Sequence, residues 1–217
     1  MARTDVVAVA LLAAFTAAVS AFEPALDPRS LADAIELGQS RIDDMRSRFH
    51  AVYHIEVMQA PVDYIEVVTP FRRIALDAEA RTRAGERLYG QREALATLGD
   101  NPSRLDVVVE LTFHPLNNYV GVPAFTVSLV PPGGRPIEPR TISRVPRFGP
   151  RLSGMLLPYP YVANSAPPPQ GTQPLLGGSI IAAFDGAALD ARGTYIVLVR
   201  DSGKDVAKAT ADLARLR

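Results

Sequence analysis

The chain has 217 residues, with 23 basic and 23 acidic side chains, so its formal net charge is zero. Hydrophobic residues make up 47% and charged residues 21% of the chain, which is typical of a globular protein and excludes a disordered or fibrous one. A neutral chain lacks the general attraction to phosphate that drives nucleic-acid binding. Because there is no cysteine, disulfides, thiolate metal ligands and a cysteine nucleophile are excluded.

The first 21 residues predict a secretory signal peptide. The stretch from Val6 to Ala18 is apolar apart from one threonine, and Val19 and Ala21 place small residues at the −3 and −1 positions before Phe22. The apolar run is shorter than the roughly 20 residues of a comfortable membrane span, so we expect cleavage rather than an uncleaved signal anchor. The mature protein is then periplasmic or secreted and has no integral membrane segment.

Residues 22–102 predict an α+β region that begins with a long helix. Asp27 is suited to cap a helix whose first residue is Pro28. Apolar residues recur behind it at helical spacing, which predicts one helix from Pro28 to Arg48; they are Leu31, Ala34, Ile35, Ile42 and Met45.

The period then changes to two, which predicts a hairpin of two short strands. Alternation from Phe49 to Met58 indicates the first strand, Ala60-Pro61 breaks it, and Asp63–Val68 indicates the second. Two further helices follow. One is capped by Thr69, starts at Pro70 and is closed by Gly85, and the other covers Gln91 to Leu98.

Residues 103–217 predict an antiparallel β-sandwich. The expected strands are Leu105–Phe113, Ala124–Val130, Arg140–Val145, Ser179–Phe184 and Thr194–Arg200. A proline-rich passage from Pro146 to Pro174 interrupts them, and regular strands are not expected there because proline cannot donate to a sheet ladder. The segment 205–217 fits either a strand or a helix, and we expect a strand because the turn Asp201-Ser202-Gly203 precedes it.

One stretch near the C-terminus resembles the tyrosine corner of immunoglobulin-like and fibronectin type III-like domains. It runs from Leu189 to Val199, with a leucine six residues before Tyr195. In those families the leucine packs inward and the tyrosine hydroxyl bonds back to the main chain. The resemblance implies an immunoglobulin-like sandwich after an α+β N-terminal region, although the proline and threonine of the fibronectin pattern and the cysteines of immunoglobulins are absent.

Four polar residues on two expected strands offer one alternative function. His54 and Glu56 share a face of the first strand, and Glu110 and His114 lie on the outer face of a later one. If those strands adjoined, two imidazoles and two carboxylates would converge on a divalent metal such as zinc, in a metal-binding protein or a metal-dependent hydrolase. Solvated outer faces explain the same residues, and we prefer that interpretation.

Arginines are concentrated between residues 135 and 151, where Glu138 alone opposes them; they are Arg135, Arg140, Arg144, Arg147 and Arg151. They suit an anionic ligand or a membrane surface. The stretch from Glu23 to Glu66 is acidic on balance. We expect instead that the basic and acidic regions pair across the fold or stay solvated, because prolines separate the arginines and no helix face unites them.

No nucleophile elbow, phosphate-binding loop or triad spacing occurs, so the sequence favours a non-enzymatic protein without a cofactor. The expected function is binding of another protein or of a component of the bacterial cell envelope. The proline-rich passage is the expected interaction surface, with contacts from Leu156, Leu157, Tyr159 and Tyr161.

Cleavage before Phe22 can be tested directly. The protein expressed in a bacterium with its own leader should appear outside the cytoplasm with Phe22 as its first residue, which N-terminal sequencing will establish. An envelope-associated form that still begins at Met1 or Ala2 would indicate an anchor instead.

Overall fold

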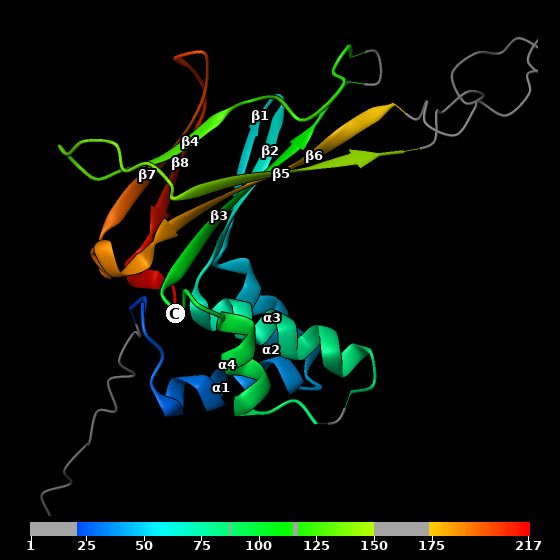
Figure 1. The fold of residues 1–217 in the computed structure, drawn as a ribbon, viewed down its shortest axis with the longest axis vertical. Coiled ribbons are helices and arrows are strands. Elements are labelled where there is room, and N and C mark those ends of the chain that lie inside the picture. The colour runs from blue at the N-terminus through cyan, green and yellow to red at the C-terminus, as the bar shows by residue number, and fades with distance from the viewer. Residues whose placement is uncertain (1–20, 87, 115–116, 150–173) are drawn as a thin grey trace, which may run out of the picture.

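A computed structural model describes residues 21–86, 88–114, 117–149 and 174–217. Within these residues the fold is α+β, with four helices, a five-stranded antiparallel sheet and a three-stranded antiparallel sheet. The helices lie together at one end of the two sheets, and the C-terminus lies where helices and sheets meet (Figure 1). No helix in the described part of the chain is long and apolar enough to cross a membrane.

The first expected helix is two helices. α1 (Pro28–Gln39) starts as predicted, with the Asp27 carboxylate accepting from the Ser30 amide, but it ends at Ser40, and α2 (Asp43–Ala51) starts separately. The single helix was therefore a wrong prediction. Ile42 and Met45 continue the apolar spacing of α1, yet both are exposed. The reason is that α1 ends at Gln39, so that neither residue lies on its buried face.

The strand expected from Phe49 begins later. Residues Phe49 to Ala51 belong to α2, so His50 is helical, and β1 covers His54–Gln59. Phe49 and Tyr53 are four residues apart with ring centroids separated by 5.0 Å, so alternation in this stretch also fits a helix end followed by a turn. The second strand is confirmed as β2 (Val62–Val68).

The remaining helices are confirmed. α3 (Pro70–Arg83) is capped by the Thr69 hydroxyl, and α4 (Gln91–Leu98) has the expected bounds. In both cases a local signal fixes the start: Thr69-Pro70 for α3, and for α4 the Glu93 carboxylate, which accepts from the Gly90 amide.

The five-stranded sheet has the order β1-β2-β3-β6-β5 and every neighbour is antiparallel; its other strands are β3 (Arg104–Thr112), β6 (Leu175–Asp185) and β5 (Thr141–Phe148). Strands β1 and β2 of the expected N-terminal region thus share a sheet with strands from the expected sandwich region. β5 also continues through Pro146, contrary to the expectation of no strand there, because an edge strand tolerates a residue that cannot donate to the ladder.

The three-stranded sheet has the order β4-β7-β8; its strands are β4 (Thr126–Val130), β7 (Thr194–Asp201) and β8 (Lys204–Asp212). The strand interpretation of residues 205–217 is correct as far as Asp212, after which a short 3-10 turn begins. An isolated bridge between Leu129 and Ile137 extends β4 toward the segment that leads into β5.

Two separate hydrophobic cores fill the molecule. The larger lies between the sheets and includes Ile65, Val109, Ile180 and Val197, all fully buried. The smaller lies among the helices and contains residues of α1, α3 and α4. Gly38 lies where α1 touches α3. A Cβ at this position would stand 2.3 Å from the Ala75 carbonyl oxygen, so the two helices can approach this closely only with glycine there.

Polar contacts around Tyr53 join the two cores. The Tyr53 hydroxyl donates to the main-chain oxygen of Arg217 at 2.9 Å, and the Thr69 hydroxyl donates to the same oxygen. The Arg217 guanidinium reaches Asp33 of α1 at 2.5 Å and lies 4.5 Å from the Phe71 ring centre. We call this group of residues the junction.

Arg72, the first buried cation of α3, strengthens the junction from the helical side. Its guanidinium donates to the Val67 carbonyl at 2.8 Å and to Glu66 at 3.1 Å, and it lies 5.0 Å from the centre of the Tyr53 ring. Only 3% of Arg72 is exposed, so these contacts replace the water that a buried charge requires.

A hydrogen bond joins the Tyr195 side chain to the main chain next to Leu189. The Asp190 amide donates to the Tyr195 hydroxyl at 2.8 Å, and both Leu189 and Tyr195 are buried.

This corner can be tested by substitution. Tyr195→Phe leaves the Asp190 amide without its partner and should lower the free energy of unfolding by about 1–2 kcal/mol. Leu189→Ala truncates a core side chain and should cost about 2–4 kcal/mol. Urea midpoints measure both, with Ile196→Ala as a control, because the neighbouring Ile196 side chain points outward and is 44% exposed. Losses no larger than that of the control would show that the corner does not support the sandwich.

Candidate functional site

The four residues of the alternative metal site do not all lie on neighbouring strands. His54 and Glu56 lie on β1 and Glu110 lies on β3, but β2 separates the two strands. Glu56 is paired with Tyr64, and Tyr64 with Glu110, so a tyrosine of β2 lies between the two glutamates. The described residues contain no group of three or more His, Asp or Glu side chains that could hold a metal ion.

Most of these polar residues have other partners on the outer face of the sheet. His54 Nδ1 lies 3.5 Å from Glu66, and the His54 ring packs 4.5 Å from the centre of Tyr64. Glu110 accepts from the Ser179 hydroxyl at 2.6 Å and pairs with Arg147 at 3.1 Å. His114 follows the end of β3 and also makes an interaction. The polar side chains of this face therefore bind one another.

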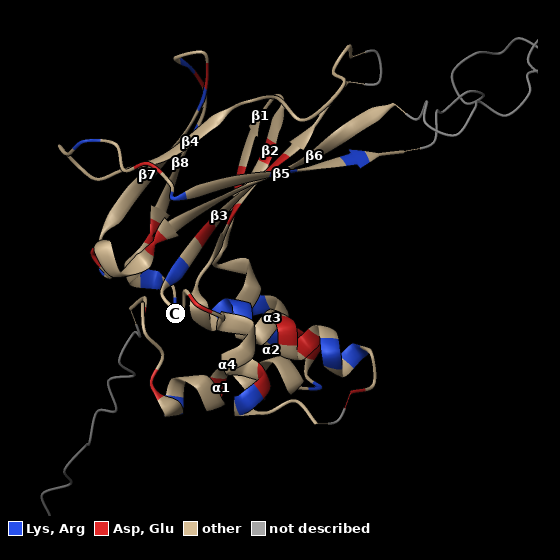
Figure 2. Cartoon of the chain, viewed as in Figure 1, with Lys and Arg blue, Asp and Glu red and all other residues tan. Residues whose placement is uncertain are grey.

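Three of the five clustered arginines also have internal partners. Arg140 pairs with Asp185, Arg144 donates to the Pro123 and Phe125 carbonyls, and Arg147 binds Glu110. Charges of both signs are mixed over helices and strands (Figure 2). The acidic partners, Asp185 and Glu110, lie outside the acidic region Glu23–Glu66, so the expected pairing between the two regions is wrong for these arginines. Arg151 lies outside the described residues, as do the expected contacts Leu156, Leu157, Tyr159 and Tyr161.

The structure brings together several apolar residues at the end of the sandwich far from the helices. We call this surface the distal end; it comprises residues 58–61, 112–114, 117–121, 147–149 and 174–176. The Thr112 amide donates to the Pro61 carbonyl, the Phe113 amide to Leu176 and the Gly149 amide to Pro174, at 2.9, 2.9 and 3.3 Å. These bonds bring segments distant in sequence to one end of the sheet (Figure 1).

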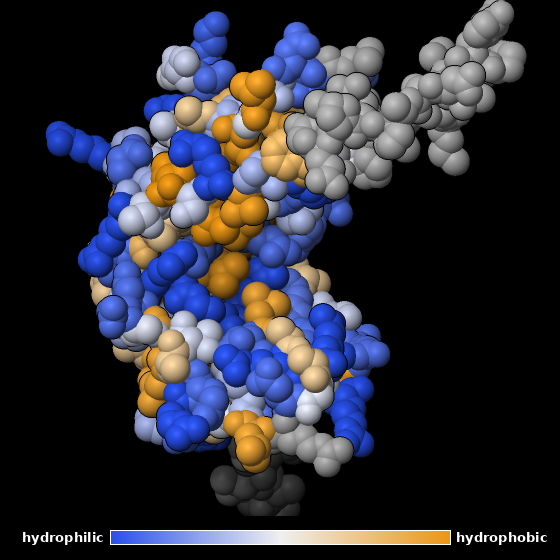
Figure 3. Space-filling view, turned by 45° about the vertical axis from the view of Figure 1, so that its right-hand side comes forward, coloured by the Kyte–Doolittle hydropathy of each residue, from blue (hydrophilic) through white to orange (hydrophobic). Residues whose placement is uncertain are grey.

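Large hydrophobic side chains at the distal end face outward. Met58 is 82% exposed, Val120 fully exposed, Phe148 50% and Tyr119 47%. Tyr119 stacks on the buried Phe113 with ring centroids 4.6 Å apart. Figure 3 shows hydrophobic residues over the sandwich part of the visible face. The sequence did not indicate this cluster, because the four residues come from three segments that only the tertiary fold unites.

A buried carboxylate holds α2 against α3. Glu79 is 6% exposed and contacts Arg46 at 3.3 Å, His50 at 3.1 Å and Arg83 at 2.5 Å. Only its i,i+4 relation to Arg83 could be predicted. Burial, followed by the nearby Arg72 cation, lowers the pKa of His50 below its ordinary value of 6.5, and Glu79 offsets this only in part. His50 is therefore mainly neutral at pH 7.

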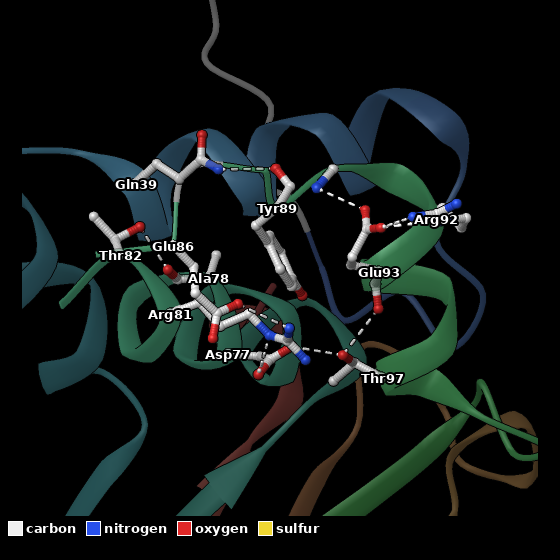
Figure 4. A network of polar contacts seen from close by, with 11 residues as sticks. Gln39, Asp77, Ala78, Arg81, Thr82, Glu86, Tyr89, Arg92, Glu93 and Thr97 are labelled. Atoms are coloured by element: carbon white, nitrogen blue, oxygen red, sulfur yellow. Dashed lines mark hydrogen bonds and ion pairs between the residues drawn. The ribbon is translucent and has the colours of Figure 1, made fainter. Parts of the chain in front are cut away.

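A second network fixes the helical layer from the other side (Figure 4). Asp77 accepts from Arg81 at 3.2 Å and from the Thr97 hydroxyl at 2.6 Å, which ties α3 to α4. Gln39 of α1 donates to the Tyr89 carbonyl at 3.0 Å. Burial beside Asp77 raises the pKa of Tyr89 to about 12, so this hydroxyl stays protonated. The network is structural, since it links three helices.

Comparison with protein-family models, with curated proteins and with solved structures finds no match to this chain.

His50 gives the protein a predictable dependence on pH. Because its pKa is lowered by folding, the unfolded chain takes up this proton at a higher pH. The stability that neutral His50 supplies is complete above about pH 6.5 and is lost as the pH falls through the folded pKa. Between about pH 7 and pH 5 the urea midpoint of the native protein should therefore fall further than that of His50→Gln, which does not titrate. A native midpoint that rises relative to the variant on acidification would show that attraction to Glu79 dominates.

Proposed function

We propose that this chain is a non-enzymatic binding protein exported to the bacterial cell envelope, periplasmic or secreted, and that its partner docks at the distal end. The partner is another protein or an envelope component. The observation that carries the proposal is the group of outward-facing apolar side chains at this end, with Val120 fully exposed. Exposed apolar clusters of this kind commonly mark interaction sites, since leaving them in water is unfavourable.

The anchoring of the proline-rich passage supports the same location. Gly149 and Pro174 flank residues 150–173 and are joined by a main-chain hydrogen bond at the distal end. The proposed contacts Leu156, Leu157, Tyr159 and Tyr161 therefore belong to a segment that leaves and rejoins the fold at this surface. Binding residues on loops that a rigid sheet positions are a common arrangement.

The proposed export is compatible with the start of the described fold. Phe22 is buried, and its main-chain nitrogen donates to the Leu213 carbonyl at 3.2 Å. Cleavage before Phe22 would turn this nitrogen into an ammonium group, which can still donate to that carbonyl. The proposed mature N-terminus would thus remain attached to the sandwich.

We also propose that the two sheets belong to the immunoglobulin-like class of sandwiches. The support is the corner itself: a buried leucine, a tyrosine six residues later, and a hydrogen bond from the Asp190 amide to the Tyr195 hydroxyl. Such sandwiches carry binding functions on their end loops, which agrees with a docking surface at the distal end.

Replacing residues 156–162 by glycine and serine tests the docking surface. The thermal midpoint should stay nearly unchanged, while capture of partners from an envelope extract should be lost. Val120→Asp should also abolish capture without loss of stability, because this side chain is fully exposed. Leu95→Asp on α4, 58% exposed and remote from the distal end, is the control and should capture normally. A large loss of thermal stability in the replacement variant would show that the segment covers the core, and normal capture by all variants would overturn the proposal.

A further inference from the structure

The helical layer contains a groove that the distal-end proposal does not use. Two adjoining cavities of about 610 and 340 Å³ lie along α1 and α2, and both are lined by Glu36 and Met45. The larger also includes Ile35 and Ile42, and the smaller includes Phe49 and Phe71. We call the two together the helical groove.

The apolar wall of this groove is open because of how α2 is held. The helix has no buried residue, and it contacts α3 through Glu79, which binds Arg46 and His50, and through Phe49, which packs on Phe71. Ile42 and Met45 remain 61% and 41% exposed. The groove is therefore formed before any ligand arrives, as binding sites usually are, and Met45 has the flexible side chain that adapts to varied apolar partners.

Charge indicates what the groove would accept. Glu36 stands at the boundary of the two cavities, is exposed, and has no ion-pair partner among the described residues. The other charged residues that line the groove, Asp33 and Arg217, neutralise each other at 2.5 Å. The groove thus presents one uncompensated negative charge within apolar surface, which complements a segment that carries a lysine or arginine among apolar residues.

We propose that the helical groove is a second binding site, for a basic amphipathic helical segment of a partner protein. Apolar side chains of that segment would cover Ile42 and Met45, and its cation would pair with Glu36. Recognition of an amphipathic helix in an apolar groove is a recurring mode of protein binding. This site is independent of the distal end, since the two lie at opposite ends of the molecule (Figure 1).

A synthetic helical peptide of leucine and lysine, labelled with fluorescein, is a suitable probe, and the same peptide with glutamate in place of lysine is its control. Anisotropy measured at about 0.15 M salt should show tighter binding of the lysine peptide than of the glutamate peptide, because this ionic strength screens unspecific attraction. Glu36→Gln should weaken binding about two- to fivefold, the range of one exposed ion pair. Met45→Lys should weaken it by about tenfold or more, since it places a like charge at the centre of the groove.

Two matched variants keep the result interpretable. Leu95→Lys, on a helix but outside the groove, should bind the peptide as the native protein does, and so should the 156–162 replacement, which separates this site from the distal end. Unchanged thermal midpoints will show that Glu36→Gln and Met45→Lys fold. Equal binding of both peptides, or native affinity in both groove variants, would overturn the proposal. A native dimer that Met45→Lys converts to a monomer would assign the groove to a second copy of this chain and would also overturn it.

Discussion

The structure depends on the junction that holds two independent hydrophobic cores in one orientation. The sandwich core and the helical core are separate, and between them lie the buried hydroxyls of Tyr53 and Thr69, both bonded to the main chain of Arg217. Thr69 directly follows β2 and caps α3, so no flexible linker intervenes between sheet and helix. A rotation of the helical layer would break these hydrogen bonds and leave buried polar groups unpaired, which is costly.

The junction also determines how α2 is placed. Tyr53 directly follows the last turn of α2, and Phe49 stacks on both Tyr53 and Phe71. With one end fixed by aromatic contacts and its side fixed by Glu79, the helix remains ordered although it buries none of its residues. The helical groove thus exists because α2 is attached by polar and aromatic contacts. A helix that packed an apolar face of its own against α1 would have closed this space.

Sequence reasoning predicted the elements that local chemistry fixes and missed those that depend on tertiary contacts. The starts of α1 and α3 follow from Asp27-Pro28 and Thr69-Pro70, and the alternation of β3 and β7 identifies them as strands. The break after Gln39 was missed because Ile42 continues the apolar spacing of α1. The metal hypothesis required β1 and β3 to adjoin, and strand order is decided by packing over the whole sheet. The contact of His50 with Glu79 joins residues 29 positions apart and leaves no local signal.

Contacts of the junction span nearly the whole chain: Tyr53 and Arg217 are 164 residues apart, and Asp33 and Arg217 are 184 apart. The contacts among α1, α3 and α4 join residues that are closer in sequence, so they can form early. The contacts to Arg217 close much longer loops, which is entropically expensive and slow. The helical layer should therefore form first and remain undocked until β8 has joined its sheet. Docking of the helices onto the sandwich is then the last step of folding, and it is the step at which Tyr53 and Thr69 acquire their shared acceptor on Arg217.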